Sequence, residues 1–176
     1  YEKLVSASVL ITPKGQRKMG GESKTYVANS VLQRGNWYKV GVKNTGIYKI
    51  SFAELKEMGI VDQPFASQLL SVFGNGGAML PEKNVNSGVD DLQELPVWMA
   101  DGGDGMMGEG DYLLFYAEGP HSWTFSSSDQ RFEHHYNLYH SEACYFVNVE
   151  GIGAGKRILT EDNASLVATT DITTYD

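Results

Sequence analysis

Residues 101–120, DGGDGMMGEGDYLLFYAEGP, place a glycine-rich acidic loop directly before an apolar strand. The loop contains five glycines and four carboxylates, and it has no Lys or Arg to neutralise them. The segment Tyr112–Ala117 has no charge and consists largely of aromatic and aliphatic side chains, which is typical of a buried strand. A loop of this kind is either a cation site or a tight turn whose Asp side chains accept hydrogen bonds from their own backbone.

The overall composition indicates a globular domain and disfavours two classes of function. The chain has 176 residues, of which 41% are hydrophobic and 11% aromatic, enough for one domain with a substantial core. Its formal net charge is −8, and a nucleic-acid partner is disfavoured because phosphate neutralisation needs concentrated Lys and Arg. No apolar run approaches the ~18 residues of a membrane-spanning helix, so no membrane span is expected. The single cysteine, Cys144, excludes an internal disulfide.

One short helix is expected at about 52–58. Ser51 is placed as its N-cap, with Glu54 three residues later as the partner in a capping box. Gly59 is suited to end the helix, because a glycine can adopt the positive φ of the residue after a C-cap.

The other expected elements are strands. Alternation of period two on both sides of Asn44-Thr45-Gly46 predicts a β-hairpin over 36–51. Further strands are expected at 68–73, 92–100, Tyr112–Ala117 and 143–149, and the GNGG sequence at 74–77 indicates a sharp turn. Pro96 favours a sheet edge or a bulge because it cannot donate a hydrogen bond to a neighbouring strand. The segment 119–139 is expected to be irregular.

Short strands with one helix and no regular strand–helix alternation predict a mostly β protein, an antiparallel β-sandwich or jelly-roll-like domain. We expect an amino-terminal strand or strands and a loop in 1–30, a β-rich domain in 31–160, and a polar linker in 161–176.

The acidic loop is the candidate cation site. Asp101, Asp104 and Asp111 supply the oxygen ligands that Ca²⁺ prefers, on a backbone that glycines allow to bend. An EF-hand is excluded: aligning Gly105 with the invariant glycine of that loop puts Ala100 and Gly102 at ligand positions. The alternative is a solvated loop of Asx turns without metal.

The histidines and Cys144 give weaker indications of chemistry. His121, His134, His135 and His140 fall in one segment, but their spacing matches no known zinc motif. Cys144 lies within an expected strand, where a thiol is usually an inert apolar side chain. No catalytic residue is therefore assigned to this chain.

Four aromatic residues form the candidate binding surface: Trp98, Trp123, Tyr136 and Tyr139. Exposed aromatic rings in a β domain can bind carbohydrate or peptide, and they can equally be ordinary packing of a tyrosine-rich fold.

Four segments, taken in order, resemble one known protein region. They are NWYKVGVKNTGIYKISFAELKEMGI (36–60), VFGNGGAMLPE (72–82), ELPVWMADGGDGMMGEGDYLLFYAEGP (94–120) and HHYNLYHSEACYFVN (134–148). As a set they resemble the amino-terminal, non-catalytic region of the Por-type sortases of the type IX secretion system. These sortases are gingipain-like cysteine peptidases of family C25 in Bacteroidetes.

The resemblance implies a role outside catalysis. In that family the catalytic His and Cys lie in a peptidase domain carboxy-terminal to this region, so this fragment is expected to lack activity. The parent would cleave carboxy-terminal sorting signals of secreted cargo and transfer the cargo to a lipopolysaccharide anchor. The domain would then pack on its own peptidase domain, or position cargo or other secretion components. Its implied location is the outer-membrane-associated cell surface or the periplasm of a Gram-negative bacterium, after removal of a signal peptide.

Two other functions are kept as alternatives. One is a self-standing surface adhesin or carbohydrate-binding module that uses Trp98, Trp123 and the segment 119–139. The other is a hydrolase in which the histidines and Cys144 act as catalysts.

Overall fold

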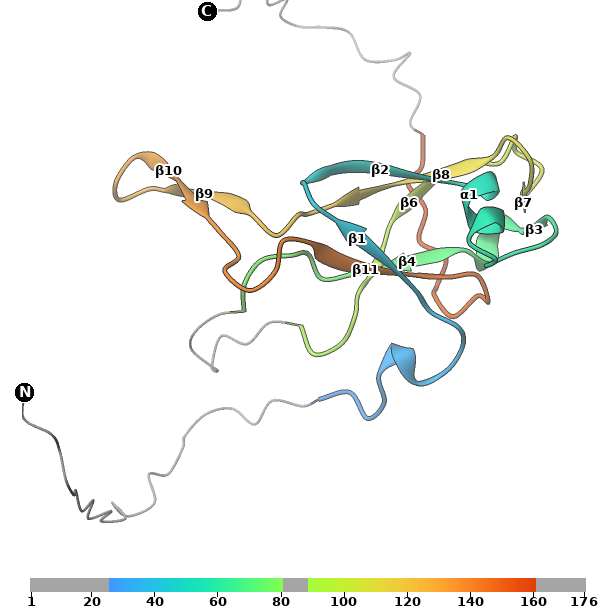
Figure 1. Ribbon diagram of the computed structural model, residues 1–176, viewed down its shortest axis with the longest axis horizontal. Helices are drawn as coiled ribbons and strands as arrows, with labels where there is room; N and C mark the ends of the chain where they lie inside the picture. Colours follow the sequence, from blue (N-terminus) through green and yellow to red (C-terminus); the bar gives the residue numbers. More distant parts are fainter. Residues whose placement is uncertain (1–25, 81–88, 161–176) are drawn as a thin grey trace, which may run out of the picture.

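The computed structural model describes residues 26–80 and 89–160 (Figure 1). Residues 1–25 of the segment 1–30, where an amino-terminal strand or strands and a loop are expected, lie outside the described residues, as does the linker expected in 161–176. The elements in chain order are η1 Val31–Gln33, β1 Tyr38–Val42, β2 Gly46–Ser51, α1 Phe52–Glu57, β3 Phe65–Ala66, η2 Ser67–Leu69, β4 Ser71–Phe73, β5 Glu94–Leu95, β6 Val97–Ala100, β7 Met106–Met107, β8 Tyr112–Ala117, β9 Ser122–Ser126, β10 Arg131–His135 and β11 Ala143–Asn148.

Two antiparallel sheets face each other across one core, which confirms the predicted mostly β fold. One sheet has the strand order β1-β11-β4-β5 and the other β2-β8-β6. Figure 1 shows β2, β8 and β6 above β1, β11 and β4, with the β9–β10 hairpin on one side and α1, β3 and β7 on the other. The core side chains come from both sheets and from α1; among the largest are Phe52, Leu55, Leu113, Phe115, Tyr145 and Val147.

Strand β8 is the central strand of its sheet and follows the alternation in its sequence. Leu113, Phe115 and Ala117 are fully or almost fully buried, and the residues between them face outward. The Phe115 ring meets the Tyr145 ring of β11 edge-on, with centroids 5.8 Å apart, so this pair joins the two sheets. Edge-to-face aromatic pairs stabilise a core beyond the apolar area that they bury.

The predicted helix and its caps are confirmed. The Ser51 hydroxyl accepts from the Glu54 N–H at 3.2 Å, and the Glu54 carboxylate accepts from the Ser51 N–H at 2.7 Å. Gly59 has φ of 70°, and the Ile60 N–H donates to the Leu55 carbonyl at 2.9 Å, which is the Schellman ending.

The hairpin predicted over 36–51 is wrong, although both of its strands exist. Strand β1 pairs with β11 in one sheet and β2 pairs with β8 in the other, so the chain crosses between sheets at 43–45. A two-residue hairpin turn of type I′ needs positive φ, and Gly46 does not have it. Each strand pairs with a distant partner because this buries the apolar faces of both strands in the core.

Two predicted strands are shorter than expected. The segment 92–100 is broken at Pro96 into β5, which pairs with β4, and β6, which pairs with β8. Both are edge strands, as the missing N–H of proline favours. The segment 68–73 begins as the 3₁₀ turn η2 and becomes strand β4 only at Ser71.

The segment 119–139 is not irregular as predicted. Strands β9 and β10 form an antiparallel hairpin in which Trp123 pairs with His134 and Phe125 with Phe132. The polar residues 127–130 close it, and Gln130 has a φ of 50°. The sequence does alternate with period two in 122–126 and 131–135, but the Ser-rich turn and the histidines between aromatic residues make this pattern hard to recognise.

Candidate functional site

The three aspartates of the candidate cation site accept hydrogen bonds from their own loop. Asp104 accepts from the Met106 N–H at 2.8 Å, and Asp111 accepts from the Gly108 N–H at 2.7 Å. Asp101 accepts from the Gly103 N–H at 3.2 Å through one oxygen. The bonds of Asp101 and Asp104, each to the N–H two residues on, are those of Asx turns, whereas Asp111 accepts from the N–H three residues before it. In the ranges 26–80 and 89–160, no group of three His, Cys, Asp or Glu side chains is arranged as metal ligands. The structure thus does not bring the three carboxylates together, and the two alternatives, a cation site and a solvated loop without metal, both stay predictions.

The other oxygen of Asp101 ties the loop to the sandwich. It accepts from the Ser67 hydroxyl at 2.6 Å, and this bond is the main cause that holds the pKa of Asp101 below its usual value. The Arg157 guanidinium, which donates to the Ser67 and Leu70 carbonyls at 2.7 and 3.0 Å, also lowers the pKa of Asp101. The acidic loop is therefore anchored by protein groups.

One face of the β9–β10 hairpin is aromatic. Trp123 stacks on His134 with ring centroids 4.3 Å apart, and the His134 ring meets Tyr136 edge-on at 4.1 Å. Phe125 and Phe132 form the next pair toward the tip, at 5.2 Å. Trp123 is 65% exposed and Phe132 is 68% exposed. Two of the four predicted aromatic residues, Trp123 and Tyr136, are thus brought together, because both rings contact the ring of His134.

The other two predicted aromatic residues lie elsewhere. Trp98 is in β6, half-buried, with its ring 6.0 Å from that of Tyr112. Tyr139 lies in the loop between β10 and β11, and its backbone N–H donates to the Asn137 side chain at 2.9 Å. The predicted surface is therefore divided among three places.

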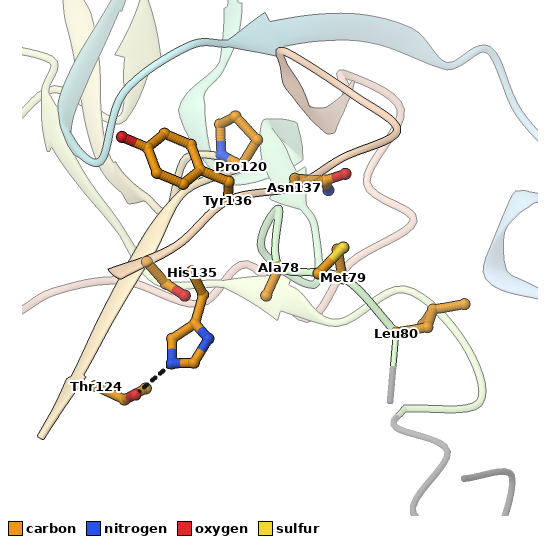
Figure 2. A pocket seen from close by; sticks show the side chains of 9 residues that line it. Ala78, Met79, Leu80, Pro120, Thr124, His135, Tyr136 and Asn137 are labelled. Atoms are coloured by element: carbon orange, nitrogen blue, oxygen red, sulfur yellow. Dashed lines mark hydrogen bonds between the residues drawn. The ribbon is translucent and has the colours of Figure 1, made fainter. Parts of the chain in front are cut away.

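A groove of about 290 Å³ lies on the polar side of the hairpin (Figure 2). The His135 Nε2 atom is 2.7 Å from the Thr124 hydroxyl, and Tyr136 and Pro120 line the same groove. The far wall is formed by residues 78–80.

A second groove, of about 300 Å³, lies at the root of the hairpin. We call it the root groove; its lining includes Thr45, Tyr116, Glu118, His121, Ser122 and Trp123. Among these, only Trp123 was predicted as a binding residue. Two signals in the sequence point to Tyr116 and Glu118: the alternation in Tyr112–Ala117 turns Tyr116 outward, and Glu118 follows the strand end directly.

Tyr145 fixes the backbone at Glu118. Its hydroxyl accepts from the Glu118 N–H at 2.7 Å and donates to the Glu118 carbonyl at 2.9 Å. Burial raises the pKa of this hydroxyl, so it stays protonated and can donate. Gly74 permits the arrangement, because a Cβ there would lie 2.2 Å from the Tyr145 ring.

The outer face of the three-stranded sheet carries apolar side chains. We call it the outer face, and its members are Ile47, Lys49, Trp98, Tyr112, Leu114 and Tyr116. Ile47 pairs with Tyr116, and Ile47 is 73% exposed. The only charged member is Lys49, whose Nζ lies 4.1 Å from the centre of the Tyr112 ring. None of the described strand residues that point outward on this sheet is an Asp or Glu, although acids outnumber bases in the chain.

Cys144 lies within β11, half-buried, opposite Gly41 in β1. The ring of His121 is used locally, since its Nδ1 atom accepts from the Asn137 N–H at 3.2 Å. At His140 it is the backbone N–H that donates to the Asn137 side chain, at 3.0 Å. The one α-helix in the described part of the chain, α1, is too short to cross a membrane.

Comparison with known proteins gives one informative similarity. No protein-family profile matches the sequence, and no curated protein matches it. The fold is similar to a solved structure, the dimeric latent PorU from Porphyromonas gingivalis, with a TM-score of 0.59 and 29% sequence identity. The match covers 81% of this chain and 12% of the PorU chain, so this chain spans a small part of that protein's length. The fold of this chain is thus similar to that of one region of PorU.

Proposed function

We propose that this chain is a non-catalytic β-sandwich domain of a sortase-like cysteine peptidase of the type IX secretion system. The similarity to PorU over 81% of the chain carries the proposal. The described residues of the four sequence segments that resemble the Por-type sortases all contribute to the sandwich or to its loops.

The proposed role is to pack on the peptidase domain of the same protein, and through it to position cargo or other secretion components. The outer face supports this role, since protein interfaces are enriched in Tyr and Trp and depleted of Asp and Glu. It combines Trp98, Leu114 and Ile47 with a single Lys. An exposed Ile47 does not stabilise the free domain. Full burial of such a side chain against a partner surface would contribute about 1.5–3 kcal/mol to the free energy of association.

Catalysis belongs to another part of the parent protein in this proposal. Cys144 lies in strand β11, between the buried core residues Ala143 and Tyr145, and the proposal gives it no catalytic role. The proposed location is the cell surface, at the outer membrane, or the periplasm.

The test compares the full-length protein with the 176-residue chain on a cargo protein that ends in a sorting signal. We expect the full-length protein to remove the signal and the chain alone to leave it intact. Cleavage by the chain alone, or a parent gene without a downstream peptidase region, would overturn the proposal.

The packing role has its own test. The double variant Ile47→Lys/Trp98→Gln in the full-length protein is expected to lower signal cleavage or the yield of folded peptidase several-fold. The exposed helix variant Glu57→Gln is the matched control and leaves both unchanged. The same double variant in the isolated chain retains its melting temperature if the face serves docking. A loss of stability there would assign these side chains to the fold of this domain instead.

A further inference from the structure

We infer that the root groove is a binding site for a neutral saccharide, one or two pyranose rings long. This goes beyond the proposed sortase role and does not depend on it. The site is not the aromatic set expected from the sequence, since Trp98 and Tyr139 take no part in it.

The walls of the groove suit a sugar ring. Trp123 from β9 and Tyr116 from β8 both line it, and both are more than half exposed. One face of the Trp123 ring is covered by His134, at 4.3 Å between centroids, which holds the indole in place. The faces of aromatic rings carry negative potential, and the C–H groups on one face of a pyranose are slightly positive. The groove volume of about 300 Å³ lies at the lower end of the range for small-ligand sites.

A carboxylate supplies the acceptors that sugar hydroxyls need. Among the described residues, no group donates a hydrogen bond to the Glu118 side chain and no cation pairs with it. Its backbone is held at both N–H and C=O by the Tyr145 hydroxyl, at 2.7 and 2.9 Å. A Cβ at Gly76 would lie 2.9 Å from Glu118 Oε2, so the glycine makes room for the carboxylate. The backbone of Glu118 is therefore held in place, and its exposed carboxylate can accept two hydroxyl donors.

Donors line the same groove. His121 Nδ1 accepts from the Asn137 N–H at 3.2 Å, so a neutral His121 carries its proton on Nε2 and can donate there. The Thr45 hydroxyl oxygen accepts from the Gly119 N–H at 3.0 Å, which leaves its own proton for a ligand. Aromatic faces, an acceptor and two donors together match a polyol with an apolar side.

The charge of the site selects against anionic sugars. Glu118 is the acidic group in the groove, and the chain carries a formal net charge of −8. Placing a second carboxylate or a phosphate beside Glu118 would cost free energy through like-charge repulsion. Neutral hexoses and N-acetylhexosamines are the expected ligands.

The experiment follows amide chemical shifts of the 176-residue chain during titration with cellobiose, lactose, maltose, mannobiose and chitobiose, each to about 20 mM, a range that detects millimolar Kd values. We expect at least one disaccharide to shift the amides of Thr45, Tyr116 and 118–123. Trp123→Ala should weaken binding at least about tenfold, and Glu118→Gln by about fivefold.

Phe132→Ala is the matched control, since it removes an equally exposed ring of the same hairpin outside the groove. It should leave Kd unchanged. Trp123 is largely exposed, so Trp123→Ala is expected to fold, and the dispersion of the free-state spectrum checks this. The inference is overturned if no disaccharide shifts these amides, if Trp123→Ala binds as the wild type does, or if Phe132→Ala loses binding equally.

Discussion

The Tyr145 hydroxyl makes two hydrogen bonds to the backbone of Glu118, and its ring packs on Phe115 of the opposite sheet. Tyr145→Phe keeps the ring and removes both bonds, leaving a half-buried N–H and C=O without their partner. We expect a loss of about 1–3 kcal/mol in the free energy of unfolding, a fall of several degrees in melting temperature. Thermal denaturation followed by circular dichroism measures it, with the exposed Tyr139→Phe as the control that changes nothing.

Glu94 gives the stability a dependence on pH. Burial acts to raise the pKa of Glu94, but hydrogen bonds from the Lys156 and Ala154 N–H groups, at 2.9 and 2.7 Å, outweigh it and hold the pKa of this carboxyl below its usual value. Because the folded pKa lies below the unfolded one, the stabilisation is fully present above about pH 5 and is lost as pH falls through the folded pKa.

Glu94→Gln is therefore expected to destabilise the chain at pH 7 by about 1–2 kcal/mol, with the difference from the wild type shrinking below pH 4.5. Urea denaturation across this range measures the difference. Tyr145→Phe serves as the comparison, because it should lower the free energy of unfolding by the same amount at every pH in this range. A Glu94→Gln deficit of constant size at all pH values would contradict the assignment.

At the scale of elements, helix α1 depends on its capping box. The chain enters the helix directly from β2, so Ser51 is at once the last residue of the strand and the N-cap. Ser51→Ala removes the hydroxyl that accepts from the Glu54 N–H and should cost about 1 kcal/mol. Ser127→Ala in the hairpin turn is the control. Equal melting temperatures for Ser51→Ala and the wild type would show that packing of Phe52 and Leu55 alone fixes the helix.

The acidic loop gives a second prediction at this scale. Asp101, Asp104 and Asp111 already accept hydrogen bonds from backbone N–H groups of their own turns. We therefore expect millimolar Ca²⁺ to leave the melting temperature of EDTA-treated protein unchanged. A cation at a free concentration of 100 times its Kd would stabilise the fold by about 2.7 kcal/mol. Such a site would therefore raise the melting temperature measurably. A rise that Asp104→Asn or Asp111→Asn abolishes would establish the cation site.

At the scale of the whole molecule, the β9–β10 hairpin stands apart from the sandwich (Figure 1). No residue of β9 or β10 belongs to the buried core cluster of the described residues. Replacing 125–132 by Asn-Gly should shorten the hairpin and leave the melting temperature within about 2 °C, because surface changes away from the core seldom exceed about 0.5 kcal/mol. A large fall in melting temperature would show that the tip supports the core. Trp123 and His134 are retained, so saccharide binding in the root groove is expected to persist.

The local elements could be predicted from the sequence, because each rests on interactions between near neighbours. The apolar alternation of Tyr112–Ala117, the Ser51–Glu54 capping box and the ending at Gly59 all act within a few residues. The edge position of the strands on either side of Pro96 was likewise indicated by the sequence, although the break between them was not. The mostly β class follows from these signals, as does the resemblance to the Por-type region.

Strand partners and the composition of the grooves were decided only by the tertiary structure. The pattern in 36–51 fits a hairpin and a crossover equally well, and the crossover wins because it buries Val42 and Ile50 in one core shared by two sheets. Likewise, Glu118 and Trp123 line one groove with Thr45, more than 70 residues away in the chain, only because Gly119 packs on the backbone of Asn44 and Thr45. Local sequence determines what each segment can form, whereas burial of the combined apolar surface determines which segments meet.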